Sequence, residues 1–157
     1  MAKTVSHPLR GLLIAQFFGA FNDNAWKLMV ALLAIRQATA QMTLGPELEA
    51  AAQTQTALTF IIFTLPLMLL SLVGGTLADR LSKRTVIIAI KIVEVFLMST
   101  GAVALWLNPA GGILPLIVLC GMGVHSALFG PSKYGILPEL IPHKHLAAGN
   151  GLLEMWT

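Results

Sequence analysis

Charged residues are scarce in this chain. Only 11% of its 157 residues are Asp, Glu, Lys or Arg, whereas soluble domains carry about 25%. Apolar residues instead make up 56% of the sequence, and the mean hydropathy is +0.79. This composition excludes an ordinary soluble domain and predicts an integral membrane protein.

Cysteine and the common catalytic motifs are also missing or nearly so. The single cysteine, Cys120, lies within an apolar segment, which excludes an internal disulfide and a cysteine-based metal site. The sequence has no phosphate-binding loop with its Lys-Ser/Thr pair, no Gly-x-Ser-x-Gly elbow and no His-Glu-x-x-His motif. We therefore expect neither an enzyme nor a bound cofactor or metal ion.

Four apolar segments are long enough to cross a bilayer, because about 20 helical residues span its hydrocarbon core. They cover residues 11–35, 57–77, 85–107 and 112–129, and a fifth begins at about residue 146. None of them alternates with the period of two that a membrane β-barrel strand requires. The expected fold class is an all-α membrane protein with four complete transmembrane helices and the start of a fifth.

Three connecting segments are expected to lie outside these helices. Residues 37–56 predict a polar, Ala-rich loop with a turn at Gly45-Pro46. Residues 74–84 predict a charged loop between two antiparallel spans, and Gly74 and Gly75 within it would let a neighbouring helix approach closely. Residues 130–142 contain three prolines and two glycines, which predicts a structured connector rather than a continuous helix.

Basic residues gather on one side of the expected spans. Seven of them precede the first span, separate the second from the third, or follow the fourth: Lys3, Arg10, Arg80, Lys83, Arg84, Lys133 and Lys144. The opposite loops carry only Arg36. By the positive-inside rule, the N-terminus and residues 74–84 face the cytoplasm. The basic residues that set this orientation also explain the sequence pI of about 9.4. We therefore expect no nucleic-acid partner.

Asp23 and Lys27 lie near the middle of the first span, between Asn22, Asn24 and further apolar residues. A charge at the bilayer centre costs at least roughly 2.5 kcal/mol, so such residues usually face a bundle interior or a water-filled cavity. The two residues are four apart and share a helix face. They either neutralise each other to hold the bundle together or, with the two asparagines, line a path for a polar solute.

The third span carries Lys91 and Glu94, three residues apart on one helix face. Lys91 is close enough to the cytoplasmic end to extend its ammonium to the interface as an anchor. Glu94 lies nearer the midplane and must be paired, protonated or wetted by a cavity. His125, at the expected end of the fourth span, is either a hydrogen-bonded structural residue or a proton sensor.

Residues 75–84 read Gly-Thr-Leu-Ala-Asp-Arg-Leu-Ser-Lys-Arg. This segment resembles the loop signature between the second and third helices of the major facilitator superfamily, which has glycine where this chain has Ser82. The resemblance implies a cytoplasmic gate, in which Asp79 meets the N-terminus of a helix from the second half of the transporter. Positive-inside topology alone explains the basic residues but not Asp79. The gate residues implied are Gly75, Asp79, Arg80, Lys83 and Arg84.

Three further segments resemble the lysophospholipid transporter branch of this superfamily: residues 21–24, residues 129–140 with Lys133 and Tyr134, and residues 148–154. The resemblance covers nearly the whole chain. It implies movement of lysophospholipid, or a related amphipathic solute, across the bacterial inner membrane. It also implies that Asn22, Asp23 and Asn24 meet the polar headgroup, while Lys27 or Lys91 pairs with its phosphate as a point charge.

A major facilitator has twelve helices in two halves, so the resemblance implies that this chain is the N-terminal part of such a bundle. Its expected partners are the lipid bilayer, the substrate and the rest of the same polypeptide. Two alternatives remain open. One is a small four-helix protein that forms an oligomeric carrier or a non-transporting subunit, and the other is the membrane part of a fused lipid acyltransferase.

Overall fold

The computed structural model describes residues 7–157, and the described residues form helices without any strand. Four helices are long: α1 (His7–Thr39), α2 (Pro46–Arg80), α3 (Lys83–Leu107) and α4 (Ile113–Gly135). Three short ones follow: α5 (Leu137–Leu140), the 3-10 helix η1 (His143–His145) and α6 (Leu146–Met155). The all-α prediction is confirmed.

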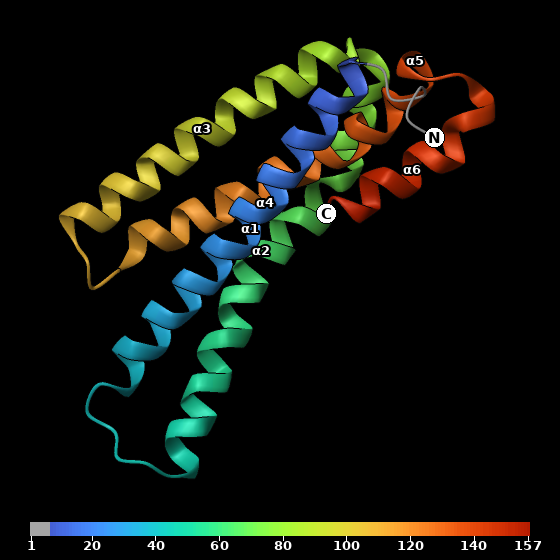
Figure 1. The fold of residues 1–157 in the computed structure, drawn as a ribbon. Coiled ribbons are helices and arrows are strands. Elements are labelled where there is room, and N and C mark those ends of the chain that lie inside the picture. The colour runs from blue at the N-terminus through green and yellow to red at the C-terminus, as the bar shows by residue number, and fades with distance from the viewer. Residues whose placement is uncertain (1–6) are drawn as a thin grey trace.

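The long helices reverse direction from one to the next (Figure 1). α4 packs against α2 and α3, while α1 packs against α2 and α4. The loops that follow α1 and α3 lie at one end of the bundle, and the α2–α3 turn lies at the other end together with α5 (Figure 1). This alternation is the arrangement expected for neighbouring membrane spans joined by short connections.

The buried apolar side chains form two groups. One lies where α1, α3 and α4 meet the short C-terminal helices, and the other lies between α1, α2 and α4. Leading members of the first group are Leu9, Phe129, Leu137 and Leu153, and of the second Trp26, Val30, Leu119 and Met122.

Glycines bring the backbones of α2 and α4 into direct contact. A Cβ atom added to Gly74 would lie 2.4 Å from the carbonyl oxygen of Ala127, and one added to Gly123 would lie 2.2 Å from that of Phe63. The close approach predicted for Gly74 is thus confirmed. Gly75 differs, because nothing lies within 4 Å of its added Cβ.

The loop predicted at residues 37–56 is largely wrong. α1 continues to Thr39 and α2 begins at Pro46, so residues 40–45 alone separate them. Proline is favoured in the first turn of a helix, and Glu47 and Glu49 are acids of that same turn. Gly45-Pro46 is therefore a helix start rather than a turn within a loop.

The charged loop predicted at residues 74–84 is also much shorter. α2 runs to Arg80 and α3 starts at Lys83, which leaves Leu81 and Ser82 between them. The N–H of Leu81 still donates to the carbonyl of Leu77, 3.0 Å away. The gate-like residues consequently lie on the last two turns of α2 and the first turn of α3.

The connector predicted at residues 130–142 begins six residues too early. α4 continues through Gly130 and Pro131 to Gly135, and only Ile136 separates it from α5. Helices in membrane proteins tolerate an internal proline when neighbouring helices compensate for the lost backbone hydrogen bond. Lys133 and Tyr134, predicted to lie in a loop, are on the final turn of α4.

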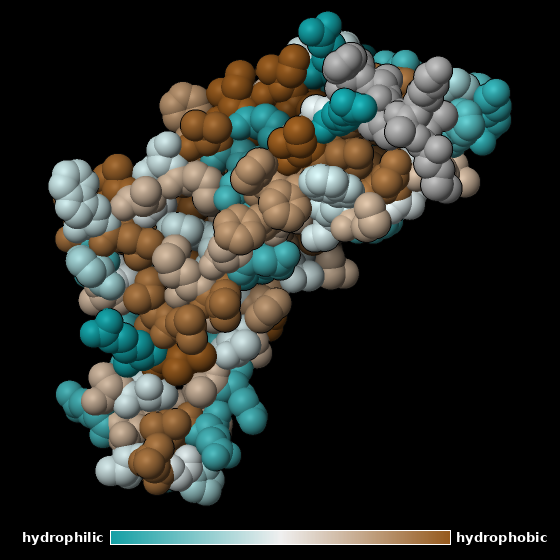
Figure 2. All heavy atoms as spheres, viewed as in Figure 1, coloured by the Kyte–Doolittle hydropathy of each residue, from teal (hydrophilic) through white to brown (hydrophobic). Residues whose placement is uncertain are grey.

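Large apolar side chains cover much of the exterior. Leu72 is 81% exposed, Phe96 67% and Trp106 85%, and apolar residues dominate the middle of the visible face (Figure 2). α2, α3 and α4 are long and apolar enough to cross a membrane. The four complete spans stay a prediction, because α1, with Asp23 and Lys27, is not among the three helices that meet these criteria.

Candidate functional site

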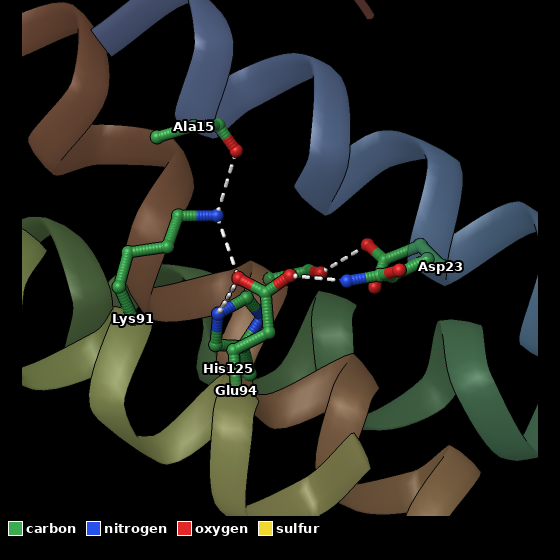
Figure 3. Close-up of polar contacts among 7 residues, drawn as sticks. Ala15, Asp23, Lys91, Glu94 and His125 are labelled. Carbon is green, nitrogen blue, oxygen red and sulfur yellow. Dashed lines mark hydrogen bonds and ion pairs between the residues drawn. The ribbon is translucent and has the colours of Figure 1, made fainter. Parts of the chain in front are cut away.

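A buried carboxylate joins three helices. Glu94 of α3 accepts a hydrogen bond on Oε1 from Asn22 of α1, 3.0 Å away, and one on Oε2 from Lys91, 2.6 Å away. The Nε2 atom of His125, on α4, lies 3.3 Å from the same Oε2 (Figure 3). The requirement that Glu94 be paired is met within the described chain.

Lys91 points into the bundle rather than toward the interface. Its ammonium donates to the backbone carbonyl of Ala15 at 2.9 Å and lies 4.4 Å from the centre of the Phe129 ring. A Cβ added to Gly19 would lie 2.7 Å from Nζ, so a glycine on α1 leaves room for this contact. The interfacial anchor considered for Lys91 is therefore wrong.

Asp23 and Lys27 share a face of α1 but form no ion pair among the described residues. Asp23 accepts a hydrogen bond on Oδ2 from Ser126 of α4 at 2.6 Å. The Lys27 ammonium instead lies 4.4 Å from the centre of the Phe63 ring on α2, a cation–π contact. Each side chain thus contacts another helix, although both line the same cavity.

Two of the cavities lie between α1 and neighbouring helices. The first, of about 300 Å³, lies between α1, α2 and α4, and Asp23, Asn24, Lys27, His125 and Lys133 line it. The second, of about 350 Å³, lies between α1 and α3 and is lined in part by Asn22, Lys91 and Glu94. The six predicted path residues therefore divide into two groups, on opposite sides of one helix.

The first cavity presents charges of both signs. Asp23 supplies a carboxylate, and Lys27 and Lys133 supply ammonium groups. Lys133 is buried, and its Nζ lies 4.9 Å from the centre of the Tyr134 ring. Such a cavity can bind a solute group that carries a negative charge, a positive charge or both.

The gate-like residues lie at the end of the bundle. Asp79, Arg80 and Arg84 are exposed, whereas Lys83 forms an ion pair with Glu139 of α5 at 3.1 Å. Tyr134 donates a hydrogen bond to Glu154 of α6. These two contacts connect α3 with α5 and α4 with α6, and the sequence analysis predicted neither of them.

His125 is another site residue that sequence reasoning placed wrongly. It was assigned to the end of a span, but the continuation of α4 to Gly135 puts it, with the neighbouring Ser126, in the middle of the helix. The long apolar run predicts this helix, but Gly130 and Pro131 were interpreted as its end, so the continuation of α4 to Gly135 was missed. Of the described residues, no group of three or more His, Cys, Asp or Glu could hold a metal ion.

Comparison with known proteins identifies relatives of the chain. Residues 34–155 match a family of the major facilitator type described as transmembrane secretion effector. The lysophospholipid transporter LplT of Photorhabdus laumondii is 33% identical over 161 residues, which cover 99% of this chain and 35% of that protein. The proteins of the same name from Pectobacterium carotovorum and Cronobacter sakazakii are each 31% identical, over 98% and 97% of this chain and 33% of their own lengths.

No solved structure matches the chain. The chain spans about a third of the length of the curated relatives that it matches. These relatives are named as transporters, and nothing in their names points to a fused acyltransferase. The family match covers most of the helical bundle described above. The chain therefore belongs to the transmembrane secretion effector family of the major facilitator superfamily and is a multi-pass membrane protein.

Proposed function

We propose that this protein is a transporter that moves lysophospholipid, or a related amphipathic solute, across the bacterial inner membrane by alternating access. The observation that carries the proposal is the cavity between α1, α2 and α4, which is lined by charged side chains of both signs. Intramembrane charges of this kind mark solute and ion paths. The named relatives supply the substrate class.

The proposed path begins with the three residues on the first cavity. A phosphate would pair with Lys27, whose ammonium lines the cavity and lies over the Phe63 ring. Asp23 and Asn24 would bind hydrogen-bond donors of the headgroup. Asn22, Lys91 and Glu94 form a polar network between α1 and α3, and they would complete the path as the helices move.

The proposed cytoplasmic gate consists of Gly75, Asp79, Arg80, Lys83 and Arg84. Asp79, Arg80 and Arg84 are exposed and are available to helices of the rest of the same polypeptide. Near the gate, Lys133 lines the cavity and Tyr134 donates a hydrogen bond to Glu154 of α6. The N-terminus lies in the cytoplasm in this arrangement, as the basic residues indicate.

The test measures uptake of a radiolabelled lysophospholipid by the full-length protein reconstituted in liposomes. Asp23→Asn and Lys27→Gln each remove a charge from the cavity and are expected to lower uptake about tenfold, since a hydrogen bond to a charged group contributes about 1.5 kcal/mol or more. The control Glu47→Gln, in the first turn of α2, removes an exposed charge and is expected to transport normally.

A monoacylglycerol, which has the acyl chain without the phosphate, is expected not to compete with the lysophospholipid. Wild-type uptake by both cavity variants, or equal competition by monoacylglycerol, would show that this cavity does not recognise the headgroup. Protein yield in the membrane fraction, compared across the three variants, separates loss of transport from loss of folding.

A further inference from the structure

Trp26 of α1 is a buried residue to which the sequence analysis assigned no role. It is 6% exposed, and its indole N–H donates a hydrogen bond to the carbonyl of Pro115, 3.3 Å away. Pro115 lies in the first turn of α4. Buried tryptophans usually find such a partner for the N–H group. The indole ring therefore connects α1 to the start of α4.

A glycine on α3 makes room for the same ring. A Cβ atom added to Gly101 would lie 2.4 Å from Cη2 and 2.8 Å from Cζ2 of Trp26. Atoms of a close-packed interior do not approach each other so closely, so the ring edge occupies the space that a larger residue would fill. Trp26 is thus held between α3 and α4 by contacts with both helices.

Lys27 follows Trp26 directly, and consecutive residues of an α-helix point about 100° apart. Trp26 accordingly faces α3 and α4, while Lys27 lines the cavity of about 300 Å³ and its ammonium lies over the Phe63 ring of α2. Because the two residues are adjacent on one helix turn, the rotation of α1 that places the indole ring also sets the direction of the Lys27 side chain.

Phe63 provides a second connection between the two residues. It is 6% exposed and belongs to the same buried apolar group as Trp26, together with Val30 and Leu119. A change in the volume of one member of a packed core is transmitted to its neighbours. Displacement of Trp26 would therefore affect both the backbone that carries Lys27 and the ring that its ammonium contacts.

We propose that Trp26, held by Gly101 and Pro115, is a positioning residue that fixes the Lys27 ammonium in the cavity where the substrate phosphate binds. Trp26 acts through Lys27 and is not among the described residues that line this cavity. A lysine side chain loses conformational freedom when it binds an anion, and an ammonium that is already positioned reduces this cost. The role in substrate binding rests on the proposed function, whereas the positioning of Lys27 does not.

The first experiment observes Lys27 without any transport. Lysines of the full-length protein in lipid nanodiscs are reductively ¹³C-methylated, which keeps their positive charge, and the signal that is lost in Lys27→Arg belongs to Lys27. We expect an upfield shift of this signal, because the ammonium lies over the face of Phe63. Trp26→Phe removes the indole N–H and Gly101→Ala displaces the ring, so each should reduce the shift. A Lys27 signal that both variants leave unchanged would overturn the proposal.

The second experiment measures lysophospholipid uptake as a function of substrate concentration. Trp26→Phe and Gly101→Ala are each expected to raise KM about fivefold with little change in the maximal rate, since the group that binds the phosphate is displaced. In a Lys27→Gln background the same substitutions should change KM by less than about twofold, because the positioned group is already absent. Equal effects in both backgrounds would mean that Trp26 does not act through Lys27.

Two matched variants serve as controls. Trp106→Phe changes a tryptophan of α3 that is 85% exposed, and Gly11→Ala adds a methyl group where nothing lies within 4 Å. Both should keep the wild-type Lys27 signal and KM. All variants are compared at equal yield in the membrane fraction, and Trp26→Phe alone decides the outcome if Gly101→Ala is not recovered.

The two readouts separate the two proposals. Wild-type protein that transports no lysophospholipid would contradict the proposed function, and the spectra would still decide whether Trp26 positions Lys27. A Lys27 signal that moves in the variants without any change in KM would retain the positioning and reject its role in substrate binding.

Discussion

At the residue scale, adjacent glycines of α2 differ in what surrounds them. Gly74 is buried against the carbonyl of Ala127, whereas Gly75 faces open space. Both were predicted to allow a helix contact. Because both are glycines in the same helical turn, their intrinsic helix propensities are equal. The sequence therefore could not tell them apart, because only the rotation of α2 against α4 decides which one touches.

Substitution by alanine should separate the two glycines. In Gly74→Ala the new methyl group would meet backbone atoms, which cannot move away, and overpacking of this kind costs about 1–3 kcal/mol. In Gly75→Ala the same methyl group meets nothing and gains up to about 1 kcal/mol of helix propensity. We expect a lower free energy of unfolding for the first variant and an unchanged or higher one for the second, measured by denaturant titration in detergent. Equal effects would mean that α2 and α4 do not touch at Gly74.

For the charged residues too, the sequence indicates that a partner is needed, and only the structure shows which residue it is. That Glu94 needs a partner followed from the cost of a charge inside the bilayer. Its partners Asn22 and His125 lie on other helices, 72 and 31 positions away along the chain, and no spacing rule predicts them. Asp23 and Lys27 fit the spacing rule, yet they bind Ser126 and Phe63 instead.

At the element scale, helix ends were the weakest part of the sequence prediction. Gly45-Pro46 and Gly130-Pro131 both looked like loop signals, although one starts a helix and the other lies inside one. A proline in the first turn loses nothing, and one inside a helix is tolerated when packing compensates. Packing of α4 against α2 and α3 is a tertiary property, so local sequence could not reveal it.

The ion pair between Lys83 and Glu139 connects the start of α3 to α5 and should contribute little stability. The side chains are 29% and 56% exposed, and pairs of this kind contribute about 0.2–1 kcal/mol. Glu139→Lys places two positive charges together and should lower the free energy of unfolding. Adding Lys83→Glu should restore it.

The effect of Glu139→Lys should shrink in about 1 M salt, where charges are screened within about 3 Å. Denaturant titrations of the wild type, both single variants and the double variant, at low and high salt, check this prediction. A loss that the double variant does not recover would mean that Glu139 acts by another contact.

At the scale of the whole molecule, orientation in the membrane can be tested. The positive-inside rule places the α2–α3 turn, which contains Ser82, in the cytoplasm and the α3–α4 loop, which contains Ala110, outside. This turn and this loop lie at opposite ends of the bundle (Figure 1). In a Cys120→Ser background, Ser82→Cys should react with a membrane-impermeant maleimide only after the cells are opened. Ala110→Cys should react in intact cells. The reverse pattern would show that the N-terminus is outside.

The sequence by itself determined the class of this protein. Long apolar runs can bury their backbone polar groups in a bilayer only as helices, and the unequal distribution of basic residues indicates orientation without any tertiary contact. Tertiary structure alone decided which polar residues meet. The rotation of each helix, set by close contacts such as that of Gly74 with Ala127, brings Glu94 to His125, Asp23 to Ser126 and Lys27 to Phe63.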